Sequence, residues 1–156
     1  MSELEERLAG AEALAHLTAE QRATVAGCGR AATHAAGEYL LREGEVANSF
    51  YIIEAGAVAL ETFVPERGAL TIETLHDGDL LGWSWLVPPY RVAFDARALT
   101  DTRSLHFEAA CLRGKCEADP ALGYALLKLF SAVILERLQS ARVQLLDLYG
   151  SSLAEL

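Results

Sequence analysis

Glycines recur through the middle of the chain and restrict what it can fold into. Short apolar runs separate them at a spacing of about 8 to 12 residues, which is typical of antiparallel sandwiches and barrels whose strands are joined by tight turns. The glycines are Gly37, Gly44, Gly56, Gly68, Gly78 and Gly82. We therefore expect a β-barrel over residues 36–110.

Several segments of this region carry signals of individual strands and turns. SFYIIEAGAVALETF alternates around Gly56, which could mark a bulge or a bend, while ERG and Asp77-Gly78 can each turn the chain. The segment VAFDARALTDTRSLHFE supplies two more strands. Because alternate residues of a strand share a face, we expect Asp95 and Arg97 to form a charge pair opposite the apolar face. That face carries Val92, Phe94 and Ala96.

Helices are predicted on both sides of the strands. Within residues 2–35, Ser2 and Thr18 each precede a Glu or Gln by three residues, the spacing of a capping box, which predicts two short helices. After a short polar link, Asp119 and Pro120 are typical of a helix start, and Gly150 is typical of a helix end. A long helix of about 45 Å is therefore expected over residues 119–150.

This long helix carries the apolar repeat of a two-stranded coil. The residues that recur every seven positions are Leu127, Ile134, Ala141 and Leu148, with Ser131, Leu138 and Leu145 at the alternate spacing. We expect a homodimer whose interface consists of Leu127, Ile134, Leu138, Ala141, Leu145 and Leu148. The alternative is a helix that packs only on its own barrel. Four apolar residues off this seam, Leu126, Phe130, Val133 and Leu146, favour a helix that does both.

Charge and cysteine content argue against several classes of protein. The formal net charge of -9 repels phosphate backbones, so we expect no direct nucleic-acid partner. No apolar run reaches the roughly 18 residues of a membrane span, and we expect a cytoplasmic protein without a membrane partner. Cys28, Cys111 and Cys116 form no CxxC motif and are odd in number, which predicts buried thiols and no disulfide.

Two segments together resemble a known family. GEYLLREGEVANSFYIIEAGAVALE followed by GDLLGWSWL is similar to the cyclic-nucleotide-binding domain family, in its catabolite-activator branch, and the likeness extends from about Leu14 to Leu148. The resemblance implies a mainly β fold with flanking α elements: an antiparallel jelly-roll β-barrel with short N-terminal helices and a long C-terminal dimerisation helix, in one domain over residues 1–156. Only SSLAEL follows Gly150, so we expect a stand-alone domain without the branch's DNA-reading module.

The resemblance also implies a ligand site, called the phosphate-binding cassette, which is altered here. In the family, backbone amides at the start of a short helix and an arginine hold a cyclic phosphate, and a glutamate directly after a glycine accepts the ribose hydroxyl. Gly82 matches that glycine, but Trp83 replaces the glutamate, and an indole can only donate. The arginine's position falls on Val92, one residue after Arg91.

The candidate ligand-binding residues are those of this altered cassette: Leu81, Gly82, Trp83, Ser84, Trp85 and Arg91. The two tryptophans either form a stacking platform for a flat ligand or fill a barrel mouth that has lost its nucleotide, and their size favours filling. Arg91 is either an anion ligand or a solvated surface arginine.

The expected function is a non-enzymatic sensory or regulatory module that binds a non-standard small effector or none. The alternatives are a ligand-free dimeric protein-interaction domain, which would dock a protein partner, and a genuine binder of cyclic AMP or cyclic GMP. We expect no catalytic residue, metal or cofactor, because the sequence offers no nucleophile and base arrangement. The four histidines, which form no HxH pair, are His16, His34, His76 and His106.

Overall fold

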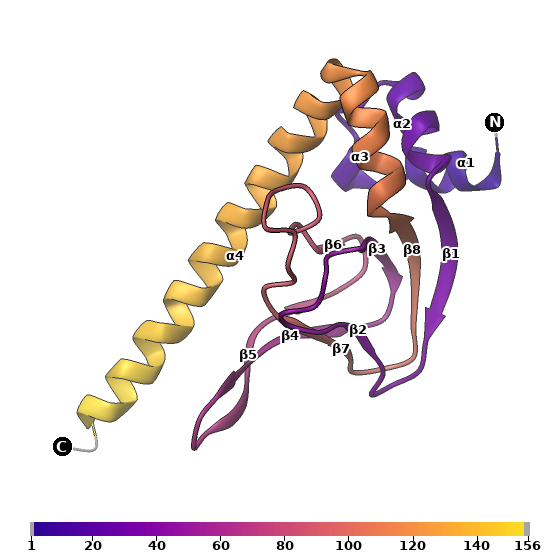
Figure 1. Ribbon diagram of the computed structural model, residues 1–156. Coiled ribbons are helices and arrows are strands. Elements are labelled where there is room, and N and C mark those ends of the chain that lie inside the picture. The colour runs from indigo at the N-terminus through magenta and orange to yellow at the C-terminus, as the bar shows by residue number, and fades with distance from the viewer. Residues whose placement is uncertain (1, 155–156) are drawn as a thin grey trace.

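Two antiparallel four-stranded sheets form the centre of the molecule (Figure 1). The structure is a computed structural model that describes residues 2–154. One sheet has the order β1 (Gly29–His34), β8 (Thr102–Glu108), β3 (Ser49–Ala55) and β6 (Leu80–Leu81). The other has the order β2 (Tyr39–Leu41), β7 (Asp95–Ala98), β4 (Val58–Val64) and β5 (Gly68–Leu75). This order is that of a jelly roll. The expected barrel is corrected to two separate sheets, because no ladder joins them among the described residues.

The first sheet has a separate apolar core on each face. Tyr51 and Ile53 of β3 pack toward the second sheet, in a core that includes Leu60 and Leu75. Phe50 and Ile52, which alternate with them, belong instead to the larger core beneath the helices. The first sheet therefore packs on one face against the second sheet and on the other face against the helices.

The two predicted N-terminal helices are confirmed. They are α1 (Glu3–Ala9) and α2 (Ala19–Ala26), with a short 3-10 turn η1 (Glu12–Leu14) between them. Ser2 Oγ accepts the Glu5 amide at 3.1 Å. Thr18 and Gln21 satisfy each other's backbone amides at 3.1 and 3.0 Å, which is a complete capping box.

The first strand begins earlier than expected, within the region assigned to the N-terminal helices. β1 occupies residues 29–34 and pairs along its whole length with β8. Arg30 pairs with His106 and Ala32 with Ser104, and none of the six residues of β1 is fully buried. Because no apolar residues alternate there, the sequence offered no period-two signal for this strand.

The predicted charge pair between Asp95 and Arg97 is wrong. Arg97 makes two hydrogen bonds to the Glu61 carboxylate of β4, at 2.9 and 3.0 Å. Asp95 instead lies 3.4 Å from Arg42 and accepts the Glu43 amide at 2.9 Å. Cross-strand neighbours lie closer together than residues two apart on one strand, so each charge finds its partner on an adjacent segment.

Two helices follow the last strand, where a polar link and one helix were expected. α3 (Ala109–Ala118) occupies the place of the link. α4 (Pro120–Ala154) begins as predicted, with Asp119 Oδ1 accepting the amides of Ala121 and Leu122 at 3.2 and 3.3 Å. The predicted end at Gly150 is wrong, since α4 continues through it. A glycine inside a helix costs only about 1 kcal/mol relative to alanine.

One side of α4 packs on the rest of the molecule and the other does not. Leu126, Phe130 and Val133 are buried in the helix-side core, as expected for residues off the seam. Leu146 was expected with them but is 61% exposed, because the C-terminal part of α4 extends beyond the sheets (Figure 1). No helix in the part of the chain that the structure describes is long and apolar enough to cross a membrane.

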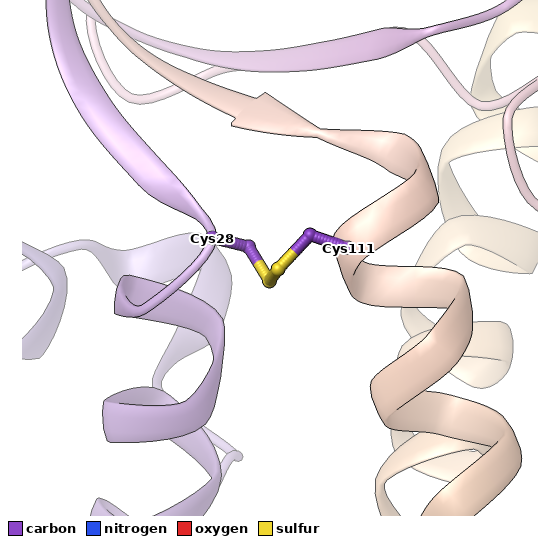
Figure 2. Close-up of a disulfide and its surroundings, with 2 residues drawn as sticks. All are labelled: Cys28 and Cys111. Carbon is purple, nitrogen blue, oxygen red and sulfur yellow. A yellow bond between two sulfur atoms is a disulfide. The ribbon is translucent and has the colours of Figure 1, made fainter.

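Cys28 and Cys111 form a disulfide, which corrects the prediction of unpaired thiols (Figure 2). Cys28 immediately precedes β1 and Cys111 lies in the first turn of α3, with Cα atoms 5.7 Å apart. They meet because β1 and β8 are antiparallel neighbours, with Gly29 opposite Phe107. Across the 83-residue separation, loop-closure entropy gives a stabilisation on the order of 4 kcal/mol. Cys116 remains a free thiol.

Candidate functional site

A small cavity lies where β6, the segment after it and α4 meet. Most of its lining is apolar, with side chains from both sheets, and the polar residues in it are Ser49, Ser84 and Arg137. Its volume is about 20 Å³, which is room for a single water molecule. Pockets that hold drug-sized ligands are typically about 300 to 1,000 Å³. In this conformation the cavity is therefore closed to a nucleotide.

The structure places four of the six candidate ligand residues in this cavity. The four are Leu81, Gly82, Trp83 and Ser84. Trp85 and Arg91 are not among the lining residues. Val92, the position at which the resemblance places the family's phosphate arginine, does line the cavity and supplies an apolar wall there.

The two tryptophans have different roles. Trp83 is half-buried and lines the cavity, edge to face with Phe94 at a centroid distance of 6.4 Å. Trp85 is fully buried in the helix-side core, stacked on Phe50 at 5.1 Å and edge-on to Phe130 at 5.3 Å. Packing therefore accounts for Trp85, whereas Trp83 forms part of the cavity wall beside Phe94.

The backbone of the cassette offers no helix N-terminus that could hold a phosphate. Residues 82–94 form turns and contain no helix, so their amides are not gathered at a helix N-terminus. Gly82 adopts a φ of +97°, and a Cβ there would lie 3.3 Å from the Ser49 carbonyl oxygen. Glycine is thus retained for its conformation and its close approach to β3.

Arg137 of α4 is the one charged residue among the described residues that line the cavity, and the sequence analysis missed it. It is 4% exposed. Its Nη2 donates to the Leu80 carbonyl of β6 at 2.6 Å, and its Nη1 lies 3.2 Å from Glu73 Oε2 of β5. Arg91, by contrast, is exposed and forms an isolated bridge with Val46.

The position of Arg137 was readable from helical spacing. Leu126, Phe130, Val133 and Arg137 follow one another at intervals of four, three and four residues, which places them on one face of a helix. A charge on a buried face needs a partner, and Glu73 is that partner. Burial raises the pKa of Glu73, while the Arg137 guanidinium acts to lower it.

A polar network continues from the cavity wall along the inner face of the first sheet. Ser49 Oγ lies 2.7 Å from His106 Nε2, and Arg30 Nε donates to His106 Nδ1 at 3.2 Å. Because Nδ1 accepts, neutral His106 carries its proton on Nε2 and donates to Ser49. A ring centroid distance of 4.9 Å separates His106 from Tyr51, whose other neighbour is His34 at 5.5 Å.

The pKa values of both histidines in this network are lowered, which favours their neutral forms. Burial lowers the pKa of His34, although the nearby Glu38 carboxylate acts to raise it. Burial and then the Arg30 guanidinium lower the pKa of His106, against a smaller opposing effect of Glu108. Protonating His106 would also turn Nδ1 into a donor that faces the Arg30 donor.

Exchanging Arg137 for methionine should destabilise the fold by about 3 kcal/mol, because Glu73 is left without its cation and Leu80 without its donor. Urea unfolding of Arg137→Met, Glu73→Gln and the double variant measures the coupling between the two side chains. We expect the double variant to lose less stability than the sum of the two single changes. Arg142→Met, on the exposed side of α4, is the matched control and should change stability by less than about 0.5 kcal/mol. Equal losses in Arg137→Met and Arg142→Met would contradict the assignment.

Acidification should destabilise the protein through His34 and His106. Their folded pKa values lie below the unfolded value of 6.5, so the unfolded state binds more protons as the pH falls. The stabilising contribution of each histidine is complete above about pH 6.5. It is lost as the pH falls from there toward the folded pKa, at about 1.4 kcal/mol per pH unit. Denaturant unfolding at pH 7.5 and pH 5 should show a smaller difference for His106→Gln than for the exposed His76→Gln; equal differences would refute the effect.

Comparison of the sequence with known protein families identifies the family of the chain. Residues 32–119, more than half of the chain, match the family profile of the cyclic nucleotide-binding domain. No curated protein matches the sequence. Among the described residues, no group of three or more His, Cys, Asp or Glu side chains could hold a metal ion.

Solved structures share the fold. A crystal structure of a putative cyclic nucleotide-binding protein from Geobacter metallireducens matches with 29% identity and a TM-score of 0.77, over 88% of this chain and 99% of that one. The catabolite activator protein of Thermus thermophilus matches at 20% identity and a TM-score of 0.68, over 88% of this chain and 62% of that one. The regulatory domain of Toxoplasma gondii PKA, crystallised with cAMP, matches at 22% identity and a TM-score of 0.68, over 83% and 49%. The chain belongs to the cyclic nucleotide-binding domain family.

Proposed function

We propose that this chain is a non-enzymatic regulatory module whose sheets hold α4 in place without a cyclic nucleotide. The observation that carries the proposal is the closed cavity of about 20 Å³, with Arg137 of α4 in its wall. In a nucleotide-dependent module, occupancy of this site would bias the position of the helix. Here a side chain of the helix itself already occupies the wall of the site.

The chemistry of the lining supports the same proposal. Trp83 and Val92 line the cavity at the positions where the resemblance places the family's glutamate and phosphate arginine, so neither a carboxylate nor a guanidinium is available there. The guanidinium of Arg137 already has partners in Glu73 and the Leu80 carbonyl. An anionic ligand would have to compete with both, and the closed lining favours a ligand-free interaction domain over a module with a different small effector.

We expect cyclic AMP and cyclic GMP to give no saturable binding up to about millimolar concentration, which corresponds to less than about 4 kcal/mol of binding free energy. The missing carboxylate, the missing arginine and the small volume are the physical reasons. Calorimetric titration measures this directly, and the combined fluorescence of Trp83 and Trp85 is recorded in parallel. Saturable micromolar binding by the unaltered protein would contradict the proposal.

The matched variant for this titration restores the two missing groups. Trp83→Glu combined with Val92→Arg supplies a carboxylate and a guanidinium at the family's positions and removes the indole from the cavity. This double variant should bind cyclic nucleotide more tightly than the unaltered protein. Equal affinities would show that Trp83 and Val92 are not what excludes the nucleotide.

We further propose that α4 pairs with α4 of a second copy. Its apolar residues remain exposed on the side away from the sheets, with Leu138 at 63% and Leu145 at 65%. Leu127 of the same predicted seam is 46% exposed, while Ile134 and Ala141 are half-buried. A second copy presenting the same heptad repeat would cover these side chains along the helix.

Light scattering should therefore give twice the chain mass of 16.8 kDa. Leu138→Glu places a charge on the seam and should weaken dimerisation by at least about tenfold, because two carboxylates would face each other in an apolar contact. Leu135→Glu is the matched control, since Leu135 is similarly exposed, at 55%, but lies off the seam. A monomeric mass for the unaltered protein, or equal effects of the two variants, would refute pairing through this seam.

A further inference from the structure

The disulfide lies beside a surface depression that is separate from the cavity described above. The depression has a volume of about 170 Å³, and its lining includes Cys28, Arg30, Glu108 and Cys111. That volume holds several water molecules and admits the end of a small thiol. Cys28 is only 7% exposed, whereas Cys111 is half-buried. Figure 2 shows the two side chains, of which Cys111 belongs to the more exposed residue, and we take it as the one that a thiol in solution attacks.

We propose that Cys28–Cys111 is a thiol–disulfide exchange site that takes a small anionic thiol at Cys111. The incoming thiolate bonds to Cys111 Sγ, the bond between the two protein sulfurs breaks, and its electron pair leaves on Cys28 Sγ, which takes a proton from water. A second thiolate attacks the incoming sulfur of the mixed disulfide and releases Cys111 as a thiol. Two thiols are thus oxidised to one disulfide while the protein gains two thiols.

The charges around the depression select the class of thiol. Arg30 is an exposed cation on its rim and attracts an anionic thiol, while the carboxylate of Glu108 opposes it. Because of Arg30, the rate of exchange depends on the charge of the incoming thiol.

The contacts around the disulfide allow exchange without unfolding. The Glu108 amide donates to the Cys28 carbonyl at 3.0 Å, and Ala109 and Leu112 of α3 are fully buried. These contacts do not involve the sulfurs, so they hold α3 after the covalent bond is cut. What changes is the tether between α3 and the start of β1, and hence the freedom of α3 to move.

α3 connects this tether to the dimer helix. Gly123 of α4 approaches α3 so closely that a Cβ there would lie 3.3 Å from the Cys116 carbonyl oxygen. A change in the anchoring of α3 therefore reaches the first turns of α4. The proposal does not depend on the closed cavity, because no residue of the depression lines that cavity.

The expected cytoplasmic location stays a prediction, and it bears on this site. Disulfides in reducing compartments of mesophiles are usually transient and redox-sensing. A bond whose two cysteines line a surface depression together with an exposed arginine has the features of such a site.

The first experiment uses the oxidised, folded chain carrying Cys116→Ser, so that the disulfide holds all the sulfur that can react. Glutathione is added without denaturant, the reaction is quenched with acid, and the mixed disulfide is located by peptide mass spectrometry. We expect one glutathione on Cys111, followed by two free thiols. A glutathione on Cys28, or a bond that resists glutathione until the protein is unfolded, would overturn the proposal.

The second experiment tests the charge selection. Exchange rates are measured with glutathione, which is anionic, and with 2-mercaptoethanol, which is neutral. Arg30→Gln should slow the glutathione reaction by about threefold relative to the neutral thiol, and Glu108→Gln should accelerate it. Arg103→Gln is the matched control, because it removes one exposed positive charge that does not line this depression. Equal rate ratios for Arg30→Gln and Arg103→Gln would overturn the assignment of an anionic thiol.

The third measurement connects the site to α3. Hydrogen exchange of the α3 amides should be at least about threefold faster in Cys28→Ser/Cys111→Ser than in the oxidised chain, while the amides of the β4–β5 hairpin should not change. The reduced chain should match the double variant. Unchanged exchange in α3 would show that the bond does not restrain this helix and would overturn the regulatory part of the proposal.

Discussion

The aromatic packing around Phe50 determines how the parts of this molecule are placed. Phe50 of β3 stacks on Phe107 of β8 at 4.5 Å and on Trp85 of the cassette segment at 5.1 Å, and it meets the edge of Phe130 of α4 at 5.1 Å. Large aromatic side chains contribute most of the area in such a core. One side chain of the sheet thus fixes the cassette segment and the long helix together. Both elements contribute residues to the wall of the cavity.

Local chemistry made the ends of several elements predictable. Each of three helices begins with a side chain that accepts a backbone amide within three residues: the hydroxyls of Ser2 and Thr18 and the carboxylate of Asp119. A few neighbouring residues in the sequence are therefore enough to predict where these helices begin. α3 has only Ala109 and Leu112 buried, which leaves too weak an apolar pattern for a helix to be recognised. The disulfide could not be anticipated for a different reason: its two halves meet only once β1 is paired with β8.

The site was predictable in outline but not in its charges. Order-specific motifs singled out Gly82 and Trp83, and counting from Arg97 put the family's arginine position on Val92; all three residues line the cavity. Arg91 was a candidate ligand because it is the arginine nearest in sequence to the expected position, whereas the arginine in the cavity wall comes from α4. The spacing of Arg137 from three apolar residues already indicated that it lies on the buried face of a helix. The buried position of Arg137 could be explained only together with the half-buried carboxylate of Glu73, on a strand far away in sequence.

Cys28 and Cys111 have a mechanical consequence that follows from their positions in the chain. All eight strands that the structure describes lie between them, so the bond closes both sheets into a covalent ring. A pull applied between α4 and the N-terminal helices passes through two sulfur atoms and does not load any of these strands. With the bond intact, tension on α4 is not carried by the strands of the jelly roll. With the bond open, the same tension runs through β1 and β8, whose antiparallel ladder begins beside the two cysteines and would separate one rung after another.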